Sequence, residues 1–201
     1  VQRSDPYGYD AMIFMDQLIS LRDYLRANAT GISNRDYGII VLNIWKDISA
    51  ALSVCESNSI LHLDVKPDNI FYASNSGYFK LSDFGVAVNS QTVRPGVYVG
   101  TPDYMAPELQ KKAGGNAKVD IYSLGVTIYQ LFNDNRLPFE GEGTDRKTAI
   151  EMRSSGKFSI PEIPGIPKEV NAVLLKCLSQ NADDRPASNR DVFEEVTELY
   201  L

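Results

Sequence analysis

The stretch ILHLDVKPDNIFYASNSGYFKLSDFG, residues 60–85, carries most of the chemistry that this sequence reveals. Its polar side chains stand between apolar runs and combine carboxylates, an ammonium group and a carboxamide: Asp64, Lys66, Asn69 and Asp83. Carboxylate and amide oxygens are ligands for hard cations such as Mg²⁺, and an ammonium group attracts phosphate. The stretch therefore predicts a site that holds a cation and a phosphate group.

A β-hairpin is expected inside this stretch. Residues 70–72 are β-branched or aromatic and favour a strand, Asn-Ser-Gly at 75–77 is typical of a turn, and residues 78–81 form the returning strand. The hairpin brings Asp83 back to the end where Asp64 and Asn69 lie. Asn69 and Asp83 are therefore the predicted Mg²⁺ ligands, with phosphate oxygens and water completing the coordination.

Three ordered motifs resemble those of eukaryotic-type protein kinases. H-L-D-V-K-P-D-N at 62–69 resembles the catalytic loop, D-F-G at 83–85 the magnesium-binding motif, and A-P-E at 106–108 the end of the activation segment. The resemblance implies an α+β, protein-kinase-like fold. Residues 19–201 would form the mainly α-helical large lobe with the short hairpin, and residues 1–18 a two-stranded remnant of the small lobe and the hinge.

The resemblance also implies roles for individual residues. Asp64 would accept the proton of a substrate hydroxyl, Lys66 would neutralise charge on the transferred phosphoryl group, and Thr101 would bridge the two. Lys66 and Thr101 together indicate serine or threonine rather than tyrosine acceptors. Asp68 lies where an acidic residue favours basic peptides, although a solvated acidic face is the commoner explanation.

ATP is the expected cofactor, together with Mg²⁺. By resemblance, the adenine would lie against the hinge, with Met15 in the gatekeeper position and backbone hydrogen bonds from Asp16 and Leu18. The other expected nucleotide-binding residues are Phe71, Lys66, Asn69 and Asp83. No G-x-G-x-x-G loop occurs at any position, and no lysine-bearing strand precedes the hinge. We therefore expect negligible kinase activity from these 201 residues by themselves.

The main departure from the kinase pattern is at position 63. Leu63 stands where most members have the arginine that pairs with a phosphorylated activation segment. Phosphorylation of Ser90 or Thr92 is therefore not expected to switch this protein by the usual route. The only histidine, His62, is expected to pack against Phe84 rather than to act as an acid or base.

Two further charged residues at family motif positions are interpreted as structural. Asp120 should accept hydrogen bonds from the backbone of the catalytic loop, and Arg185 should form a buried ion pair with Glu108.

Helices are predicted from capping residues and from apolar residues at three- and four-residue spacing. A short helix follows Ser20, and a long one begins at Asn34 or Asp36 and ends near Ser57. The run at 118–132 is apolar on most sides, which is typical of a buried central helix. The remaining helices are expected at about 145–154, 168–179 and 188–199, and residues 89–99 read as a mobile activation segment.

Composition narrows the function further. A net charge of −6 without any basic run argues against nucleic-acid binding. Cys55 and Cys177 lie in apolar surroundings typical of reduced, buried cysteines, with a disulfide as the less favoured alternative. No apolar run of about 18 residues and no signal peptide are apparent. We expect a cytoplasmic protein, or a cytoplasmic domain of a larger one, whose oligomeric state the sequence does not predict.

Two other functions have to be weighed. A non-catalytic, kinase-like binding or scaffold module is possible in principle, but a scaffold has no need of the metal site formed by Asn69 and Asp83. A small-molecule phosphotransferase of the aminoglycoside-kinase type shares the H-x-D-x-x-x-x-N loop. Those enzymes lack the segment G-T-P-x-Y-M-A-P-E, which this chain carries at 100–108. The favoured function is a Ser/Thr protein kinase that acts on protein substrates.

Overall fold

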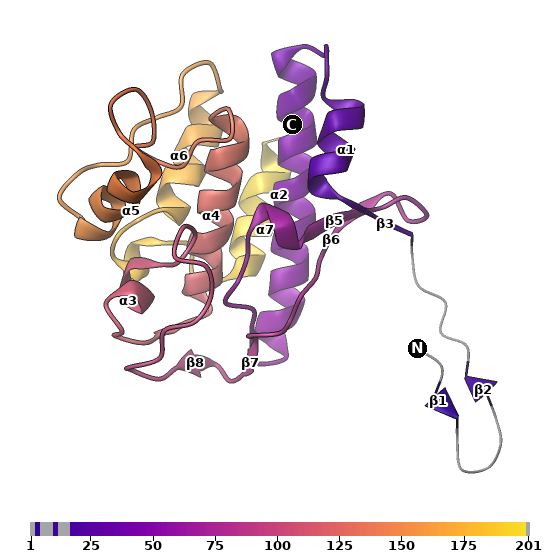
Figure 1. The fold of residues 1–201 in the computed structure, drawn as a ribbon, viewed down its shortest axis with the longest axis horizontal. Helices are drawn as coiled ribbons and strands as arrows, with labels where there is room; N and C mark the ends of the chain where they lie inside the picture. The colour runs from indigo at the N-terminus through magenta and orange to yellow at the C-terminus, as the bar shows by residue number, and fades with distance from the viewer. Residues whose placement is uncertain (1–2, 5–9, 12–16, 200–201) are drawn as a thin grey trace.

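A computed structural model describes residues 3–4, 10–11 and 17–199, and helices dominate it (Figure 1). The α-helices are α1 (Leu21–Asn28), α2 (Asn34–Ser57), α3 (Pro107–Gln110), α4 (Lys118–Phe132), α5 (Arg146–Ser155), α6 (Lys168–Cys177) and α7 (Asn189–Glu198). Short 3₁₀ helices span Pro67–Asn69 and Ala182–Asp184. The helices predicted from the sequence are therefore confirmed, with ends shifted by no more than a few residues.

The strands are short and all their pairings are antiparallel. They are β1 (Arg3–Ser4), β2 (Asp10–Ala11), β3 (Leu18–Ser20), β4 (Ile60–Leu61), β5 (Ile70–Ala73), β6 (Tyr78–Leu81), β7 (Val88–Asn89), β8 (Thr92–Val93) and β9 (Gly115–Asn116). The largest sheet has the order β3-β5-β6, and the other pairs are β1-β2, β4-β7 and β8-β9. The predicted hairpin is β5-β6, in which Ile70 faces Leu81 and Ala73 faces Tyr78.

Side-chain caps fix the starts of the first two helices. Ser20 accepts a hydrogen bond from the backbone N–H of Asp23 at the start of α1, and Ser33 does the same for Asp36 at the start of α2. Such caps satisfy backbone donors that have no partner within the helix. They position α1 directly after β3, which itself pairs with β5 beside the catalytic loop.

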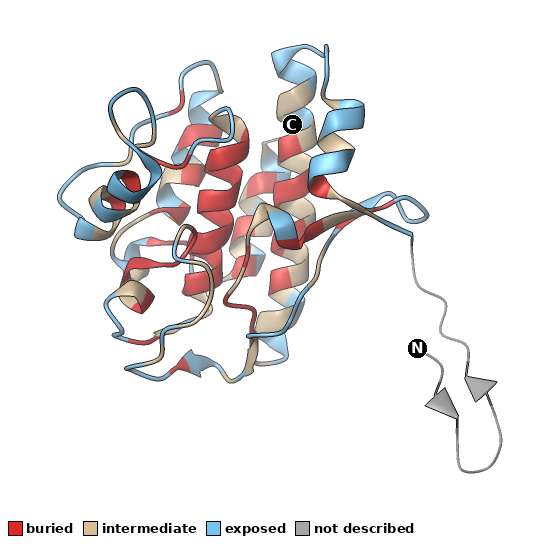
Figure 2. Cartoon of the chain, viewed as in Figure 1, coloured by how far each residue is buried: buried red, intermediate tan, exposed pale blue. Residues whose placement is uncertain are grey.

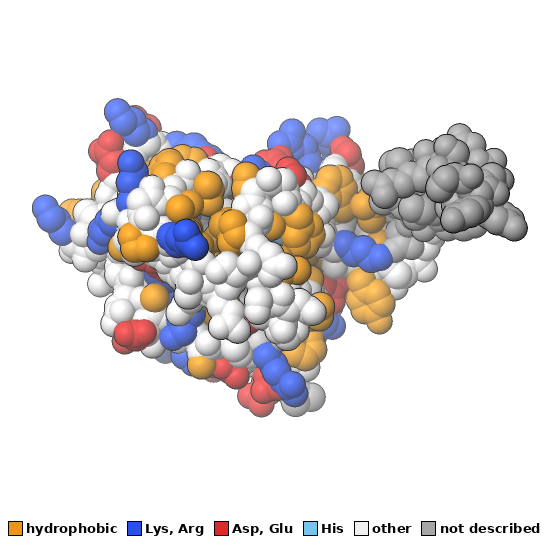
Figure 3. Space-filling model, turned by 90° about the horizontal axis from the view of Figure 1, so that it is seen from below, with side chains coloured by type: hydrophobic (Ala, Val, Ile, Leu, Met, Phe, Trp, Pro, Cys, Tyr) orange, Lys and Arg blue, Asp and Glu red, His pale blue; other side chains and the backbone are white. Residues whose placement is uncertain are grey.

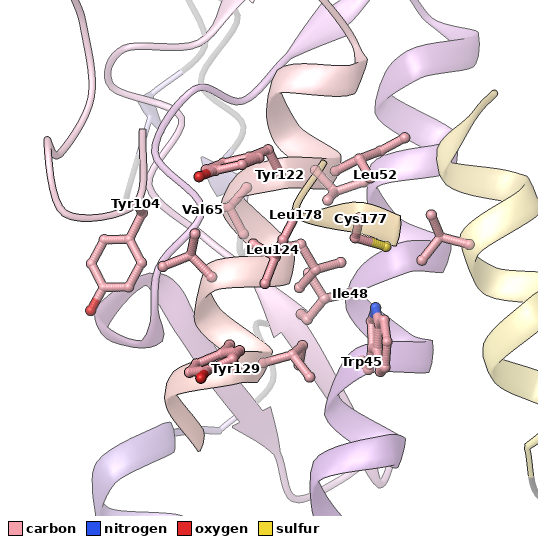
Figure 4. Close-up of a cluster of buried hydrophobic side chains, with 14 of the residues drawn as sticks. Trp45, Ile48, Leu52, Val65, Tyr104, Tyr122, Leu124, Tyr129, Cys177 and Leu178 are labelled. Carbon is pink, nitrogen blue, oxygen red and sulfur yellow. The ribbon is translucent and has the colours of Figure 1, made fainter. Parts of the chain in front are cut away.

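Helix α4 is the centre of the domain. Every residue from Val119 to Leu131 is buried, and Figure 2 shows the helix as an almost continuous buried column. A helix that is apolar on nearly all sides has to be covered by other elements. Helices α2, α6 and α7 pack against it. Figure 4 shows Ile48 and Leu52 of α2 converging with Leu124 of α4 and Leu178.

Helix α2 corrects one expectation. By length and composition alone it could cross a membrane, because an 18-residue window within it has a mean hydropathy of 1.5. The expectation that no such apolar run exists was therefore wrong. One face of α2 is covered by the domain itself, since Val41, Ile44, Trp45, Ile48 and Leu52 are all buried and the helix packs against α4 and α7. This packing accounts for the apolar residues on that face of α2.

Charged side chains on the face drawn in Figure 3 are scattered, with basic and acidic groups interspersed. No continuous basic patch is visible on this face. The chain as a whole carries a net charge of −6.

Candidate active site

Asp120 anchors the catalytic loop to the central helix. Its two carboxylate oxygens accept hydrogen bonds from the backbone N–H groups of His62 and Leu63, each at 2.8 Å. Leu63 has a φ of 66°, a left-handed conformation that costs a non-glycine residue about 1–2 kcal/mol. Because the buried carboxylate holds both amides, the loop keeps this strained turn. The predicted role of Asp120 is confirmed.

Asp64, Lys66 and Thr101 form a closed hydrogen-bonded triangle. Lys66 Nζ donates to Asp64 Oδ2 at 2.7 Å and to Thr101 Oγ1 at 2.8 Å, while the Thr101 hydroxyl donates to Asp64 Oδ1 at 2.6 Å. Thr101 comes 37 residues after Asp64. The fold thus brings together the three residues that the sequence proposed as the catalytic group.

This triangle also controls the charge of Asp64. Partial burial opposes ionisation of the carboxyl, but hydrogen bonds from Lys66, Thr101 and Asn69 outweigh burial and hold the pKa of Asp64 below its ordinary value. Asp64 is therefore a carboxylate at neutral pH, with the ammonium group of Lys66 beside it.

Asn69, at the start of the hairpin, is hydrogen-bonded to Asp64. Its side chain is only 5% exposed, and its amide nitrogen donates to the backbone carbonyl of Asp64 at 2.8 Å and to Asp64 Oδ2 at 3.1 Å. Both hydrogen bonds use the nitrogen, which fixes the orientation of the carboxamide and leaves its oxygen available as a ligand. That orientation fits the Mg²⁺-ligand role predicted from the sequence.

Asp83 reaches the same end of the hairpin as Asn69. Its neighbour Ser82 donates hydrogen bonds from both its backbone N–H and its hydroxyl to the carbonyl of Asn69, at 2.9 and 3.1 Å. Asp83 is exposed and has a φ of 61°, and its Oδ1 accepts a hydrogen bond from the Gly85 amide. Within the described ranges no cluster of three or more His, Cys, Asp or Glu side chains could hold a metal. A Mg²⁺ site built on one carboxylate and one carboxamide relies on phosphate oxygens for its other ligands.

His62 is a packing residue in this structure. It is buried, its ring lies 4.8 Å from the ring of Phe84 in an edge-on arrangement, and its Nε2 is 3.0 Å from the carbonyl of Ser82. The expected contact between His62 and Phe84 is confirmed. Phe84 remains 46% exposed, so this contact covers only part of its ring.

The activation segment is fastened by backbone pairing. Strand β7 pairs with β4 next to the catalytic loop, β8 pairs with β9 just before α4, and the amide of Gly96 donates to the carbonyl of Lys112 at 2.8 Å. Leu63, in place of the usual arginine, is 4% exposed and belongs to the hydrophobic core. Backbone pairing and core packing therefore hold the segment at several points.

Gly100 allows this segment to pass close to the catalytic loop. It has a φ of +95°, and a β-carbon at this position would collide with the backbone carbonyl of Leu63. Only glycine accommodates both the positive φ and this close approach. The next residue, Thr101, is thereby delivered to Asp64 and Lys66.

The residues predicted to hold the nucleotide are only partly described. Leu18 lies in β3, 39% exposed, and pairs with Ala73, while Ser20 of the same strand pairs with Phe71, which is half-buried. Met15 and Asp16 lie outside the described residues. The structure thus places Leu18 and Phe71 on the sheet that also carries Asn69 at its end.

A cavity of about 860 Å³ opens beside the catalytic loop. It lies between α1, the loop residues Pro67 and Asp68, and the segment that follows Thr101. Asp68 forms an ion pair on this wall of the cavity, since Arg22 Nη2 of α1 lies 3.6 Å from Asp68 Oδ1. Sequence reasoning missed Arg22, because nothing in the sequence indicates that α1 faces the catalytic loop.

Gln130 is a second residue that the sequence analysis missed. It is buried in α4 and accepts a hydrogen bond at 2.7 Å from the hydroxyl of Tyr104, which lines the same cavity. Gln130 is the one amide side chain in the mainly apolar run 118–132, and this is the signal that could have revealed it, because buried polar groups require partners.

Comparison with known proteins agrees with this geometry. Residues 9–197 match the family model described as the protein kinase domain. The chain is 34% identical over 155 residues to serine/threonine-protein kinase Pkn1 of Myxococcus xanthus, covering 74% of this chain and 22% of that protein. It is 30% identical over 179 residues to human serine/threonine-protein kinase Nek5, covering 84% of this chain and 25% of that protein.

A third relative is serine/threonine-protein kinase PrkC of Bacillus subtilis, which is 26% identical over 199 residues, covering 98% of this chain and 30% of that protein. The chain thus spans less than a third of the length of each of these three relatives. The match to the kinase family model nevertheless extends over most of the chain, and it includes the catalytic loop, the hairpin and the activation segment. The chain belongs to the protein kinase family.

Proposed function

We propose that the intact protein is a serine/threonine protein kinase. The observation that carries this proposal is the triangle of Asp64, Lys66 and Thr101, with Asn69 fixed against Asp64. A carboxylate held ionised beside a cation is suited to receive a hydroxyl proton while the cation faces a transferred phosphoryl group. The serine/threonine kinases among the relatives support the same class of acceptor.

The proposed reaction is transfer of the γ-phosphoryl group of ATP. The bond between the γ-phosphorus and the oxygen that bridges it to the β-phosphorus breaks, and a bond from the same phosphorus to the acceptor oxygen forms. The proton of the acceptor hydroxyl passes to Asp64 Oδ, and ADP leaves. Lys66, which already contacts Asp64 and Thr101, faces the charge that develops on the phosphoryl oxygens.

Asn69 and Asp83 are the residues that would hold Mg²⁺, which neutralises the phosphates when bound. The chain's own contribution is orientation. The amide nitrogen of Asn69 is fixed by Asp64, and the hydrogen bonds of Ser82 to the Asn69 carbonyl fix the end of the hairpin that carries Asp83. We propose that Leu18 and Phe71, together with Met15 and Asp16, contact the nucleotide.

The proposed partners are ATP and a protein that presents a serine or threonine. The 860 Å³ cavity beside Asp68 is the proposed place for the acceptor chain, because it opens next to the catalytic loop. The proposed location is the cytoplasm, or a cytoplasmic domain of a larger protein. Two free cysteines agree with a reducing compartment.

The proposal is tested with the intact protein, ATP labelled at the γ-phosphate, Mg²⁺ and a mixed protein substrate. Label is expected on serine and threonine and not on tyrosine, and Asp64→Asn should lower the rate by roughly 10²- to 10⁴-fold. The matched control is Asp183→Asn, which makes the same change at an exposed aspartate in the 3₁₀ helix Ala182–Asp184, outside the candidate active site, and should retain the rate within an order of magnitude. Equal rates for the wild type and Asp64→Asn would exclude the proposed role.

Two further outcomes separate the alternatives. A protein that binds partners but transfers no label would be the scaffold module that was considered from the sequence. The isolated chain of 201 residues, which contains no Gly-rich loop, should transfer negligible label because ATP positioning provides most of the catalysis. Efficient phosphorylation by the isolated chain would contradict that second expectation.

A further inference from the structure

Arg153 on α5 is buried without an acidic partner. The residue is 1% exposed, and within the described part of the chain no carboxylate lies at ion-pairing distance from its guanidinium group. Two of its nitrogens, Nε and Nη1, have no hydrogen-bond partner. Burial lowers its pKa, yet an arginine remains charged at neutral pH. A buried cation of this kind is costly and therefore requires an explanation.

The one nitrogen of Arg153 that is engaged holds the backbone of the activation segment. Nη2 donates to the carbonyl oxygen of Asp103 at 2.5 Å, and the carbonyl of Pro102 lies 3.4 Å away. These two residues follow Thr101, whose hydroxyl contacts Asp64 and Lys66. The guanidinium group therefore contacts the two residues that directly follow Thr101, although Arg153 is far from Asp64 in the sequence.

A second arginine of α5 holds the same loop from outside. Arg146 lies two helical turns before Arg153, and its guanidinium contacts the Asp103 carboxylate at 2.6 Å. The backbone of Asp103 is therefore bound by Arg153 and its side chain by Arg146. Helix α5 thus contacts the loop that follows Thr101 through two arginines, one at the backbone of Asp103 and one at its side chain.

The aromatic ring of Tyr122 partly compensates for burial of Arg153. The ring centroid lies 5.9 Å from Arg153 Cζ, at the edge of the range for a cation–π contact. Tyr122 belongs to the central helix α4 and also lies under Arg185, whose charge is already balanced by Glu108. An apolar side chain would fill the position of Arg153 without this cost, so the arginine is not explained by core stability.

We propose that Arg153 is a positioning residue that holds the Pro102–Asp103 carbonyls and thereby places Thr101 against Asp64 and Lys66. The consequence for catalysis rests on the proposed kinase function, whereas the structural consequence for residues 101–105 does not. The amides of Tyr104 and Met105 report on this loop directly, because both donate to the carbonyl of Thr101, at 3.0 and 3.1 Å.

Hydrogen exchange of the 201-residue chain tests the proposal without any activity measurement. In Arg153→Met, exchange in the segment 101–105 should be roughly ten- to a hundredfold faster, as expected when a hydrogen bond from a charged donor is lost. The melting temperature should fall by no more than about 4 °C or should rise, because a costly buried charge has been removed. Lys147→Met is the matched control, since it removes an exposed charge from the same helix and should leave exchange unchanged.

Every outcome of this comparison decides the proposal. A variant that fails to fold, or that melts at a much lower temperature, would show that Arg153 is a structural residue and would overturn it. Unchanged exchange in 101–105 would overturn it as well. In the intact kinase, Arg153→Met should lower kcat/KM for the protein acceptor about tenfold or more while leaving KM for ATP unchanged. An intact wild type without kinase activity would refute the proposed function but not the exchange result.

Discussion

Arg185 and Glu108, which are 77 residues apart in the sequence, form a bidentate ion pair. Arg185 Nη1 donates to Glu108 Oε1 at 2.7 Å and Nη2 donates to Oε2 at 2.8 Å, and the arginine side chain is completely buried. The same guanidinium group also donates to the carbonyls of Lys118 and Ser179. The predicted ion pair between Arg185 and Glu108 is confirmed, and the hydrogen bond to Lys118 also ties the end of the activation segment to the start of α4.

Removal of this buried cation should destabilise the domain. Arg185→Ala is expected to lower the free energy of unfolding by about 3–5 kcal/mol, because Glu108 and two backbone carbonyls lose their donor. Urea denaturation of the 201-residue chain measures this change. Arg190→Ala is the control, since its ion pair with Glu194 is exposed and should contribute little to the free energy of unfolding. Similar losses for both variants would argue against the importance of the buried pair.

The hydroxyl of Thr101 should matter for catalysis more than for stability. Thr101→Val keeps the shape of the side chain but removes the hydrogen bonds to Asp64 and Lys66. Since hydrogen bonds to charged groups are involved, kcat of the intact kinase should fall roughly ten- to a hundredfold. Thr101→Ser restores the hydroxyl and should recover most of the rate. Wild-type turnover by Thr101→Val would contradict this role.

The close approach between Gly100 and the Leu63 carbonyl predicts a position-specific penalty for alanine. Gly100→Ala and Gly96→Ala both place alanine at a positive φ, which costs about 1–2 kcal/mol. Gly96 has open space around it, so only Gly100→Ala also collides with backbone atoms. Thermal denaturation should therefore show a larger loss for Gly100→Ala. Equal losses would mean that the loop moves freely away from Leu63.

Activity should not depend on phosphorylation of Ser90 or Thr92. Leu63 cannot pair with a phosphate, and the activation segment is already held by the β8-β9 pairing and by the hydrogen bond from Gly96 to Lys112. The double variant Ser90→Ala, Thr92→Ala of the intact kinase should retain wild-type kcat and KM. Phosphatase treatment of the wild type offers an independent check. Loss of activity in either experiment would show that a phosphate is required after all.

The two free cysteines should differ in reactivity. Cys177 is 1% exposed, and burial raises its pKa to about 12, so it remains a thiol through neutral and mildly alkaline pH. Cys55 is partly exposed, contrary to the expectation that both are buried. A thiol reagent at pH 8 should modify Cys55 alone in the folded chain and both cysteines after denaturation. Reaction of Cys177 in the folded chain would contradict its burial.

Much of this protein was readable in the sequence because its signals are local. The hairpin at 70–81 follows from strand-forming residues around an Asn-Ser-Gly turn, and the helices follow from caps such as Ser20 and from apolar spacing. The catalytic loop and the D-F-G motif lie close together in the chain. Their meeting at one end of the hairpin is a consequence of antiparallel pairing, which sequence patterns express directly.

The tertiary structure decided what depends on distant segments meeting. That Thr101 closes a triangle with Asp64 and Lys66 was implied by family resemblance, but its geometry depends on Gly100 passing the Leu63 carbonyl. Nothing in the sequence indicates the contact between Arg22 and Asp68 or the hydrogen bond from Arg153 to the carbonyl of Asp103. An arginine in a helix usually faces solvent, and only the packing of α5 against the activation segment buries this one. Sequence therefore determined the parts of the active site, and long-range packing determined what holds them in place.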